Sequence, residues 1–257
     1  MILHAAEQGA GPPLALLHGL FGAGRNLGVI ARALAPRFRV IALDLRNHGD
    51  SLHAPSMAYP EMAEDVAETL AGMDALPAHL LGHSMGGKVA MRLALDRPGV
   101  VQHLIVADIA PVANPPHFEA IADAMQVLPP GLGRAEADAA LASAVPDPAL
   151  RAFLLQNWRD GRWRIGLGAI IANMAAIEGW DSPAGARFDG PTLFVGGARS
   201  DYIRPEYRPA IRALFPAARF VTIKNAGHWL HADKPAAVIA VVEAFLHAAP
   251  GTTETGR

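Results

Sequence analysis

The chain has 257 residues, of which 51% are hydrophobic and 18% charged, so it can build the core of an α/β domain and is not disordered as a whole. The 22 lysines and arginines nearly balance the 24 aspartates and glutamates, and the net charge of −2 does not favour nucleic acid or an anionic membrane as a partner. The absence of cysteine excludes disulfide bonds, a thiolate nucleophile and a cysteine-bound metal.

Six short apolar runs predict the strands of a mostly parallel sheet. In chain order they are Leu14–Leu17, Phe38–Leu43, His79–Gly82, Val101–Ala107, Thr192–Val195 and Arg219–Ile223. Helical spacing of apolar residues follows Pro60, Ser84 and Asp233, and Asp233 is the expected N-cap of the last helix, with Pro235 in its first turn. Strands that alternate with helices in this way indicate a sheet covered by helices.

The segment 111–189 interrupts this alternation, because it contains helical pieces but no convincing strand. We therefore expect residues 1–110 and 190–249 to form the core, residues 111–189 to form an inserted helical cap, and residues 250–257 to be a disordered tail. Three tryptophans of the insertion either line the underside of the cap or pack its interior, and packing is the more common role. They are Trp158, Trp163 and Trp180.

A candidate nucleophile stands between the third predicted strand and the helix that follows it. The residues Gly82-His83-Ser84-Met85-Gly86 match G-x-S-x-G. A serine on a sharp turn from strand to helix exposes its hydroxyl at the edge of the sheet, and the flanking glycines allow the backbone to pass closely. The pattern predicts Ser84 as a nucleophile, whereas the alternative is an ordinary turn with a serine cap.

Serine needs a general base, and His228 is the preferred candidate among 11 histidines. It follows the last predicted strand, where a loop faces the same crevice as Ser84, and it comes late in the chain, as the order Ser, acid, His requires. His231 is a nearby competitor. Three other histidines come too early in that order and are expected to position loops: His18, His48 and His83.

Two aspartates can supply the acid that orients His228. Asp108 ends the fourth predicted strand, and Asp201 follows the fifth. Both strand ends can direct a carboxylate at the imidazole, and we prefer Asp108. The backbone N–H groups of Leu20 and Met85 are the candidate oxyanion hole, because one should come from the residue after the nucleophile and the other from the loop after the first core strand.

Five motifs together resemble the α/β-hydrolase superfamily, and most closely the YbfF-type bacterial esterases. They are His18–Gly22, Asp44–Ser51, Gly82–Lys88, Asp108–Pro111 and Ala226–Trp229, with Asp160–Arg164 as the main match in the cap. The resemblance implies an α/β-hydrolase fold with a small helical cap. The short N-terminus departs from the superfamily pattern, and we expect one early strand to be missing. The resemblance also implies hydrolysis of short acyl esters or acyl-CoA thioesters without a cofactor, and it favours Asp108 as the acid.

The same residues leave other functions open. The protein can be a C–C bond hydrolase, a lactonase or a perhydrolase with the same three residues, or a binding module of this fold without activity. The scattered histidines do not favour a metal site. No stretch is long and apolar enough to span a membrane, and the N-terminus lacks a signal-peptide pattern. We expect a cytoplasmic monomer or homodimer that binds a small ester or thioester.

Overall fold

A seven-stranded sheet forms the centre of the computed structural model, which describes residues 1–116 and 118–247. Its strands are β1 (Ala5–Gln8), β2 (Pro13–Leu17), β3 (Arg39–Leu43), β4 (Ala78–His83), β5 (Val101–Ala107), β8 (Thr192–Gly197) and β9 (Ala218–Ile223). The strand order is β1-β3-β2-β4-β5-β8-β9, and every neighbouring pair is parallel except β1 with β3. The six predicted strands are confirmed. The sequence did not predict β1, because its four residues include no bulky apolar side chain.

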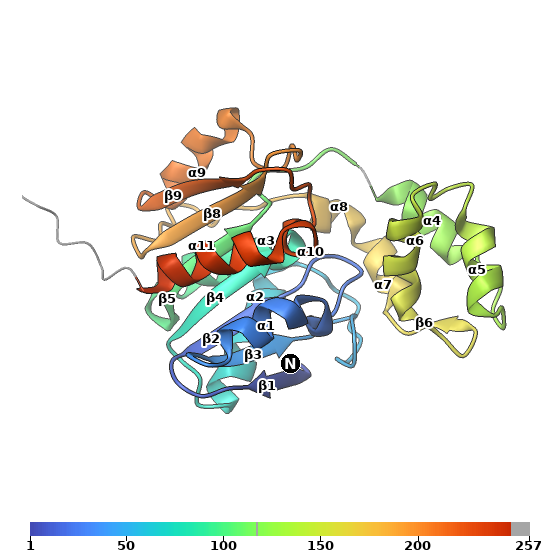
Figure 1. Ribbon diagram of the computed structural model, residues 1–257, viewed down its shortest axis with the longest axis horizontal. Helices are drawn as coiled ribbons and strands as arrows, with labels where there is room; N and C mark the ends of the chain where they lie inside the picture. Colours follow the sequence, from blue (N-terminus) through green and yellow to red (C-terminus); the bar gives the residue numbers. More distant parts are fainter. Residues whose placement is uncertain (117, 248–257) are drawn as a thin grey trace, which may run out of the picture.

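Helices cover both faces of this sheet, as predicted (Figure 1). Helices α1 (Gly28–Leu34) and α11 (Pro235–His247) pack on one face, and α2 (Tyr59–Gly72), α3 (Met85–Asp96) and α9 (Arg208–Leu214) pack on the other. Alternate residues of the strands supply the two cores: in β2, Leu16 faces α1 whereas Leu17 faces α3. The shorter helices are η1 (Gly24–Leu27), η2 (Pro98–Val100), η4 (Pro205–Tyr207) and α10 (Leu230–Asp233).

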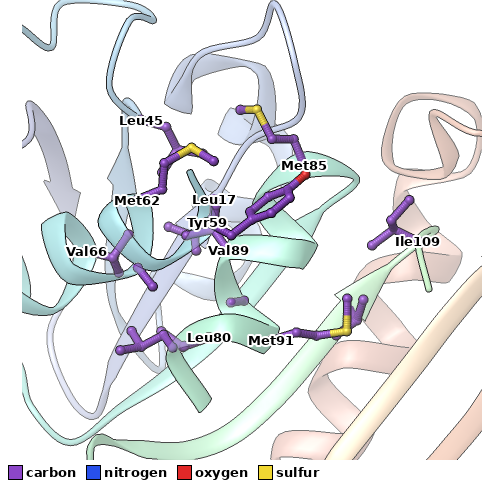
Figure 2. Packing of buried hydrophobic residues seen from close by; sticks show 14 of the residues in the cluster. Leu17, Leu45, Tyr59, Met62, Val66, Leu80, Met85, Val89, Met91 and Ile109 are labelled. Atoms are coloured by element: carbon purple, nitrogen blue, oxygen red, sulfur yellow. The ribbon is translucent and has the colours of Figure 1, made fainter. Parts of the chain in front are cut away.

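Apolar packing holds helix α3 on the sheet, and this helix carries Ser84 at its N-terminal end. Figure 2 shows Val66 of α2 and Val89 of α3 beside Leu17 and Leu80 of the central strands, and all four are fully buried. Burial of each such side chain contributes about 1.5–3 kcal/mol. Cumulative burial of this kind fixes the start of α3 against the carboxyl end of β4.

The segment between β5 and β8 forms the predicted helical insertion, which lies beside the core at one end of the sheet (Figure 1). Its elements are α4 (Glu119–Gln126), α5 (Arg134–Leu141), α6 (Pro148–Leu154), η3 (Leu155–Asn157), β6 (Trp158–Arg159), β7 (Arg162–Trp163), α7 (Leu167–Ala172) and α8 (Met174–Glu178). The prediction that this segment contains no strand was wrong, because β6 and β7 pair antiparallel. Asp160 and Gly161 both have positive φ, at 51° and 70°, as a two-residue hairpin turn requires.

Two further expectations concern the end of the chain. Asp233 is not the N-cap of α11, because it is the last residue of α10, and its carboxylate accepts the N–H of Gly227 at 2.7 Å instead. Pro235 begins α11, in agreement with the prediction. The predicted tail 250–257 lies outside the described residues.

Candidate active site

Ser84 lies on a sharp turn between β4 and α3, with φ 52° and ψ −120°. The turn needs close backbone approach: a Cβ on Gly82 would lie 2.2 Å from the carbonyl oxygen of Gly86, and one on Gly86 would lie 2.4 Å from that of Leu17. The Ser84 N–H donates to the carbonyl of Ala107 at 2.9 Å, which ties the turn to the end of β5. The two glycines therefore allow a strained turn that holds the hydroxyl up from the sheet.

His228 lies in the loop between β9 and α10 and reaches Ser84 from the far end of the chain. Its Nε2 is 3.0 Å from Ser84 Oγ, and its Nδ1 is 2.7 Å from Asp108 Oδ2. Because the carboxylate can only accept, Nδ1 carries the proton and Nε2 is free to accept the serine proton. His83 holds the loop that carries His228, because its Nε2 donates to the carbonyl of His228 at 2.8 Å. The Tyr202 ring stacks on the imidazole, with centroids 4.2 Å apart.

The structure brings Asp108, rather than Asp201, to the imidazole. Asp108 follows β5 with φ 54°, and its side chain is fully buried. Its Oδ1 accepts the N–H of Gly197 at 2.8 Å, and its Oδ2 accepts the hydroxyl of Ser200. Asp201 is exposed, and within residues 1–116 and 118–247 its carboxylate takes no hydrogen bond. Donors from the end of β8 thus keep the Asp108 carboxylate aimed at His228.

Leu20 and Met85 both lie beside Ser84 and line the same cavity with it. Met85 is the first residue of α3, and the loop after β2 passes so close to Ser84 that a Cβ on Gly19 would lie 3.2 Å from the serine Cβ. Among the described residues, neither the Leu20 N–H nor the Met85 N–H donates to another group of the chain. Both donors are therefore available to an oxygen bound above Ser84.

Two buried histidines hold the loop that carries Leu20. His48 Nε2 accepts the N–H of Phe21 at 3.1 Å, and His18 Nε2 accepts the N–H of Leu45 at 2.9 Å. Burial lowers the pKa of His18 and brings the pKa of His48 to about 3, so both rings stay neutral and can accept. The structure thus places them where the sequence expected them, in loop positions.

Two chambers meet at Ser84. The first lies between the core and helix α6, and its lining is mostly apolar, with Phe118, Leu150, Phe153 and Trp229 beside His228. The competing histidine, His231, lines this chamber too, but it contacts the ring of His83 rather than Ser84. The second chamber lies toward α8 and has polar residues in its wall, among them Tyr59, Lys88, Asn114 and Glu178. The serine hydroxyl is therefore accessible from two sides of different chemistry.

Sequence reasoning missed Lys88, which lies one helical turn after Ser84 and is only 1% exposed. Its Nζ donates to the carbonyls of Glu178 (2.9 Å) and Gly179 (2.7 Å), at the end of α8. The Tyr59 hydroxyl donates to the carbonyl of Ile177 next to them. Burial lowers the pKa of Lys88 to about 7. The sequence did contain a signal for this residue, because Lys88 lies on the apolar face of its helix. A lysine is almost never buried without a partner for its ammonium group.

The three tryptophans of the insertion contact protein groups. The rings of Trp158 and Trp163 pack edge to face at 5.0 Å, and their indole N–H groups donate to the carbonyls of Leu132 and Met125. Trp180 donates to Ser182. None of the three lines either chamber at Ser84.

One group of three possible metal ligands occurs among the described residues: His4, Asp44 and Asp50. It lies outside both chambers at Ser84, and Asp44 already accepts the N–H groups of Gly24 and Asp50.

None of the helices described combines the length and the apolar character that a membrane crossing demands.

Comparisons of the sequence and of the structure with known proteins point to the same family. The sequence pattern of the alpha/beta hydrolase fold family matches residues 12–235. The sn-1-specific diacylglycerol lipase ABHD11 of Mus musculus is 41% identical over 91% of this chain and 81% of its own length. Esterase YbfF of Escherichia coli is 38% identical over 95% of this chain and 96% of its own. A solved marine microorganism esterase superposes with a TM-score of 0.92 at 38% identity, covering 95% of this chain and 99% of that one.

Proposed function

This chain belongs to the α/β-hydrolase fold family and is a hydrolase of the esterase and lipase type, and we propose that it cleaves carboxylic esters or thioesters through Ser84, His228 and Asp108. The observation that carries the proposal is the continuous hydrogen-bond chain from Ser84 Oγ through the imidazole to the Asp108 carboxylate. A nucleophile, a base and an orienting acid in that order are what acyl transfer to serine needs.

The mechanism follows from the geometry. Ser84 Oγ attacks the carbonyl carbon of the acyl group while His228 Nε2 takes the hydroxyl proton. The new oxyanion binds two N–H groups: that of Leu20, in the loop after β2, and that of Met85, at the positive end of helix α3. Asp108 stabilises the imidazolium, which then protonates the leaving alcohol or thiol. A water molecule, deprotonated by His228, releases the acid and restores Ser84.

The shape of the site supports an acyl substrate. The apolar chamber under α6 is small, but it adjoins a larger cavity of about 530 Å³ that shares Leu150, Phe153 and Trp229 with it. These aromatic and aliphatic walls suit a hydrocarbon chain. The names of the relatives, a diacylglycerol lipase and an esterase, agree with an ester as the bond that is cleaved. C–C bond, lactone or perhydrolase chemistry would use the same three residues, and a substrate panel separates these reactions from ester hydrolysis.

Substitution of the nucleophile tests the proposal. Ser84→Ala should lower the kcat for p-nitrophenyl butyrate and butyryl thioesters by about 10⁴-fold or more, with unchanged circular dichroism and melting temperature. Ser143→Ala is a matched control, because Ser143 is an exposed serine of the insertion outside both chambers, and this variant should retain most of the activity. A folded Ser84→Ala protein with wild-type turnover would overturn the assignment, and inactivity of the wild type on every acyl substrate would favour a binding module.

A further inference from the structure

A short segment after β8 contacts both the candidate acid and the candidate base. The hydroxyl of Ser200 donates to the Asp108 carboxylate, and two residues later the ring of Tyr202 stacks on the imidazole of His228. Asp201, which lies between them, is exposed and makes neither contact. Hydrogen bonding explains the position of Ser200, but it does not explain why an aromatic ring covers the imidazole.

The two hydrogen bonds of His228 leave one motion of its ring poorly restrained. Nδ1 lies 2.7 Å from Asp108 Oδ2 and Nε2 lies 3.0 Å from Ser84 Oγ, so both contacts are made at the edge of the ring. Contacts at two edge atoms do little to oppose a tilt of the ring about the line that joins them. A side chain packed on the face of the ring opposes this tilt, and Tyr202 lies in that position.

Three aromatic rings lie near the imidazole among the residues described, and Tyr202 is the one that covers its face. Its centroid is 4.2 Å from that of His228, and the two ring planes differ by 29°. The rings of His83 and Trp229 are farther away, at 4.8 Å and 5.7 Å, and meet the imidazole at steeper angles of 43° and 68°. The stacking contact of His228 therefore falls to Tyr202.

The charge of His228 changes during the proposed reaction. The imidazole takes the serine proton and becomes an imidazolium, and the face of an aromatic ring attracts a cation within about 6 Å of its centroid. The His228 side chain is only 14% exposed, so water screens this attraction only in part. An attraction that exists only after proton transfer lowers the barrier of the reaction and does not strengthen the binding of substrate.

We propose that Tyr202 is a positioning residue that acts through His228: its ring holds the imidazole between Ser84 and Asp108 and stabilises the imidazolium that forms there. This role rests on the proposed acyl transfer at Ser84. The Tyr202 hydroxyl has no part in it, and within residues 1–116 and 118–247 this hydroxyl makes no hydrogen bond. The face of the ring, rather than the phenol oxygen, therefore carries the role.

Steady-state kinetics with p-nitrophenyl butyrate separate the ring from its hydroxyl. Tyr202→Leu should lower kcat by about tenfold or more and change KM by less than about threefold, whereas Tyr202→Phe should keep most of the wild-type kcat. Tyr207→Leu is the matched control, because Tyr207 packs against the same core cluster but lines neither chamber at Ser84. A wild-type kcat in Tyr202→Leu, or an equal loss in Tyr202→Phe, overturns the proposal.

A second series of variants keeps the shape of the ring and changes only its charge distribution, so it does not depend on the folding of Tyr202→Leu. Tyr202 is replaced by phenylalanine and then by its monofluoro, trifluoro and pentafluoro derivatives, which remove the negative potential of the ring face stepwise. The kcat should fall along the series at a constant melting temperature. An equal kcat across the series overturns the stabilisation of the imidazolium.

The rate at which a fluorophosphonate labels Ser84 distinguishes failure of this role from failure of the proposed function. Labelling that Tyr202→Leu slows by about tenfold and Tyr202→Phe leaves unchanged supports both. Labelling of Ser84 at the wild-type rate in Tyr202→Leu overturns the role of Tyr202 and leaves the acyl transfer intact. A wild-type protein that is not labelled at Ser84 overturns the acyl transfer and the role of Tyr202 with it.

Discussion

The strand ends of the core and the inserted segment meet at Ser84, but they are built differently. In the core, neighbouring strands β4, β5 and β8 pair residue by residue, and their carboxyl ends carry Ser84, Asp108 and the donors to Asp108. The insertion consists of α-helices of five to eight residues, the three-residue helix η3 and a hairpin whose strands have two residues each. Polar contacts such as those of Lys88 connect it to the core. We therefore expect sheet register to position the proposed reacting groups, Ser84 and Asp108, and the insertion to determine how a substrate fits.

The largest expected effect is at the acid of the core. Asp108→Asn should lower the kcat for p-nitrophenyl butyrate by about 10³–10⁴-fold, because an amide cannot hold the imidazole in the tautomer that accepts the serine proton. Steady-state kinetics at neutral pH measure it. Asp201→Asn is the control and should change kcat by less than about threefold. If only the Asp201 variant loses turnover, the roles of the two carboxyls are reversed.

The core should also lose stability in acid, through histidines at the other end of the strands. Burial and the neighbouring His103 lower the pKa of His79 to about 4, and the two rings lie 4.8 Å apart. The unfolded chain binds a proton at about 6.5, so stability is fully present above that pH and falls as the pH drops toward 4, by about 3 kcal/mol from His79.

Urea unfolding of wild type and His79→Phe between pH 7 and pH 4 measures this loss. The phenylalanine keeps a ring against Phe38 and should make the pH dependence less steep by the contribution of His79, while the buried His18 and His48 continue to contribute. The exposed control His53→Gln should retain the wild-type dependence. Equal slopes for wild type and His79→Phe would show that the acid sensitivity arises elsewhere.

Changes at the junction of core and insertion should affect binding more than chemistry. Lys88→Met removes two hydrogen bonds to the end of α8 and should raise KM for a long-chain ester by about tenfold, with a smaller change in kcat for p-nitrophenyl acetate. The control is Lys234→Met, a lysine that is exposed and outside both chambers. A kcat loss equal for both esters would place Lys88 in support of the nucleophile instead.

The smallest effect should come from within the insertion. Trp158→Phe keeps the aromatic packing but loses the hydrogen bond to Leu132, so it should cost about 1 kcal/mol locally and change KM for long esters only a few-fold. Hydrogen exchange of the hairpin, followed together with KM, measures both. A loss of activity on acetate esters comparable to that of Asp108→Asn would abolish the distinction between the two regions.

The same division separates what the sequence could predict from what it could not. Apolar runs predicted the six strands, and the ends of these strands gave Ser84, His228 and two candidate acids, because the carboxyl ends of parallel strands lie at one edge of a sheet. Strand ends alone did not decide between Asp108 and Asp201, and the family resemblance strengthened the preference for Asp108. Local chemistry was harder to read. The hairpin was missed although Asp160-Gly161 is a turn signal, since strands of two residues show no periodicity. Asp233 was assigned to α11 because sequence alone does not reveal its bond to Gly227.

The most direct test of the account is covalent labelling of Ser84. A fluorophosphonate probe should modify the wild-type protein at one equivalent, at the peptide that contains Ser84, and His228→Ala should slow the reaction by several orders of magnitude because the hydroxyl loses its base. Intact-mass and peptide mass spectrometry measure both. A wild-type protein that stays unlabelled, or is labelled equally fast without His228, would contradict the claim that the imidazole activates this serine.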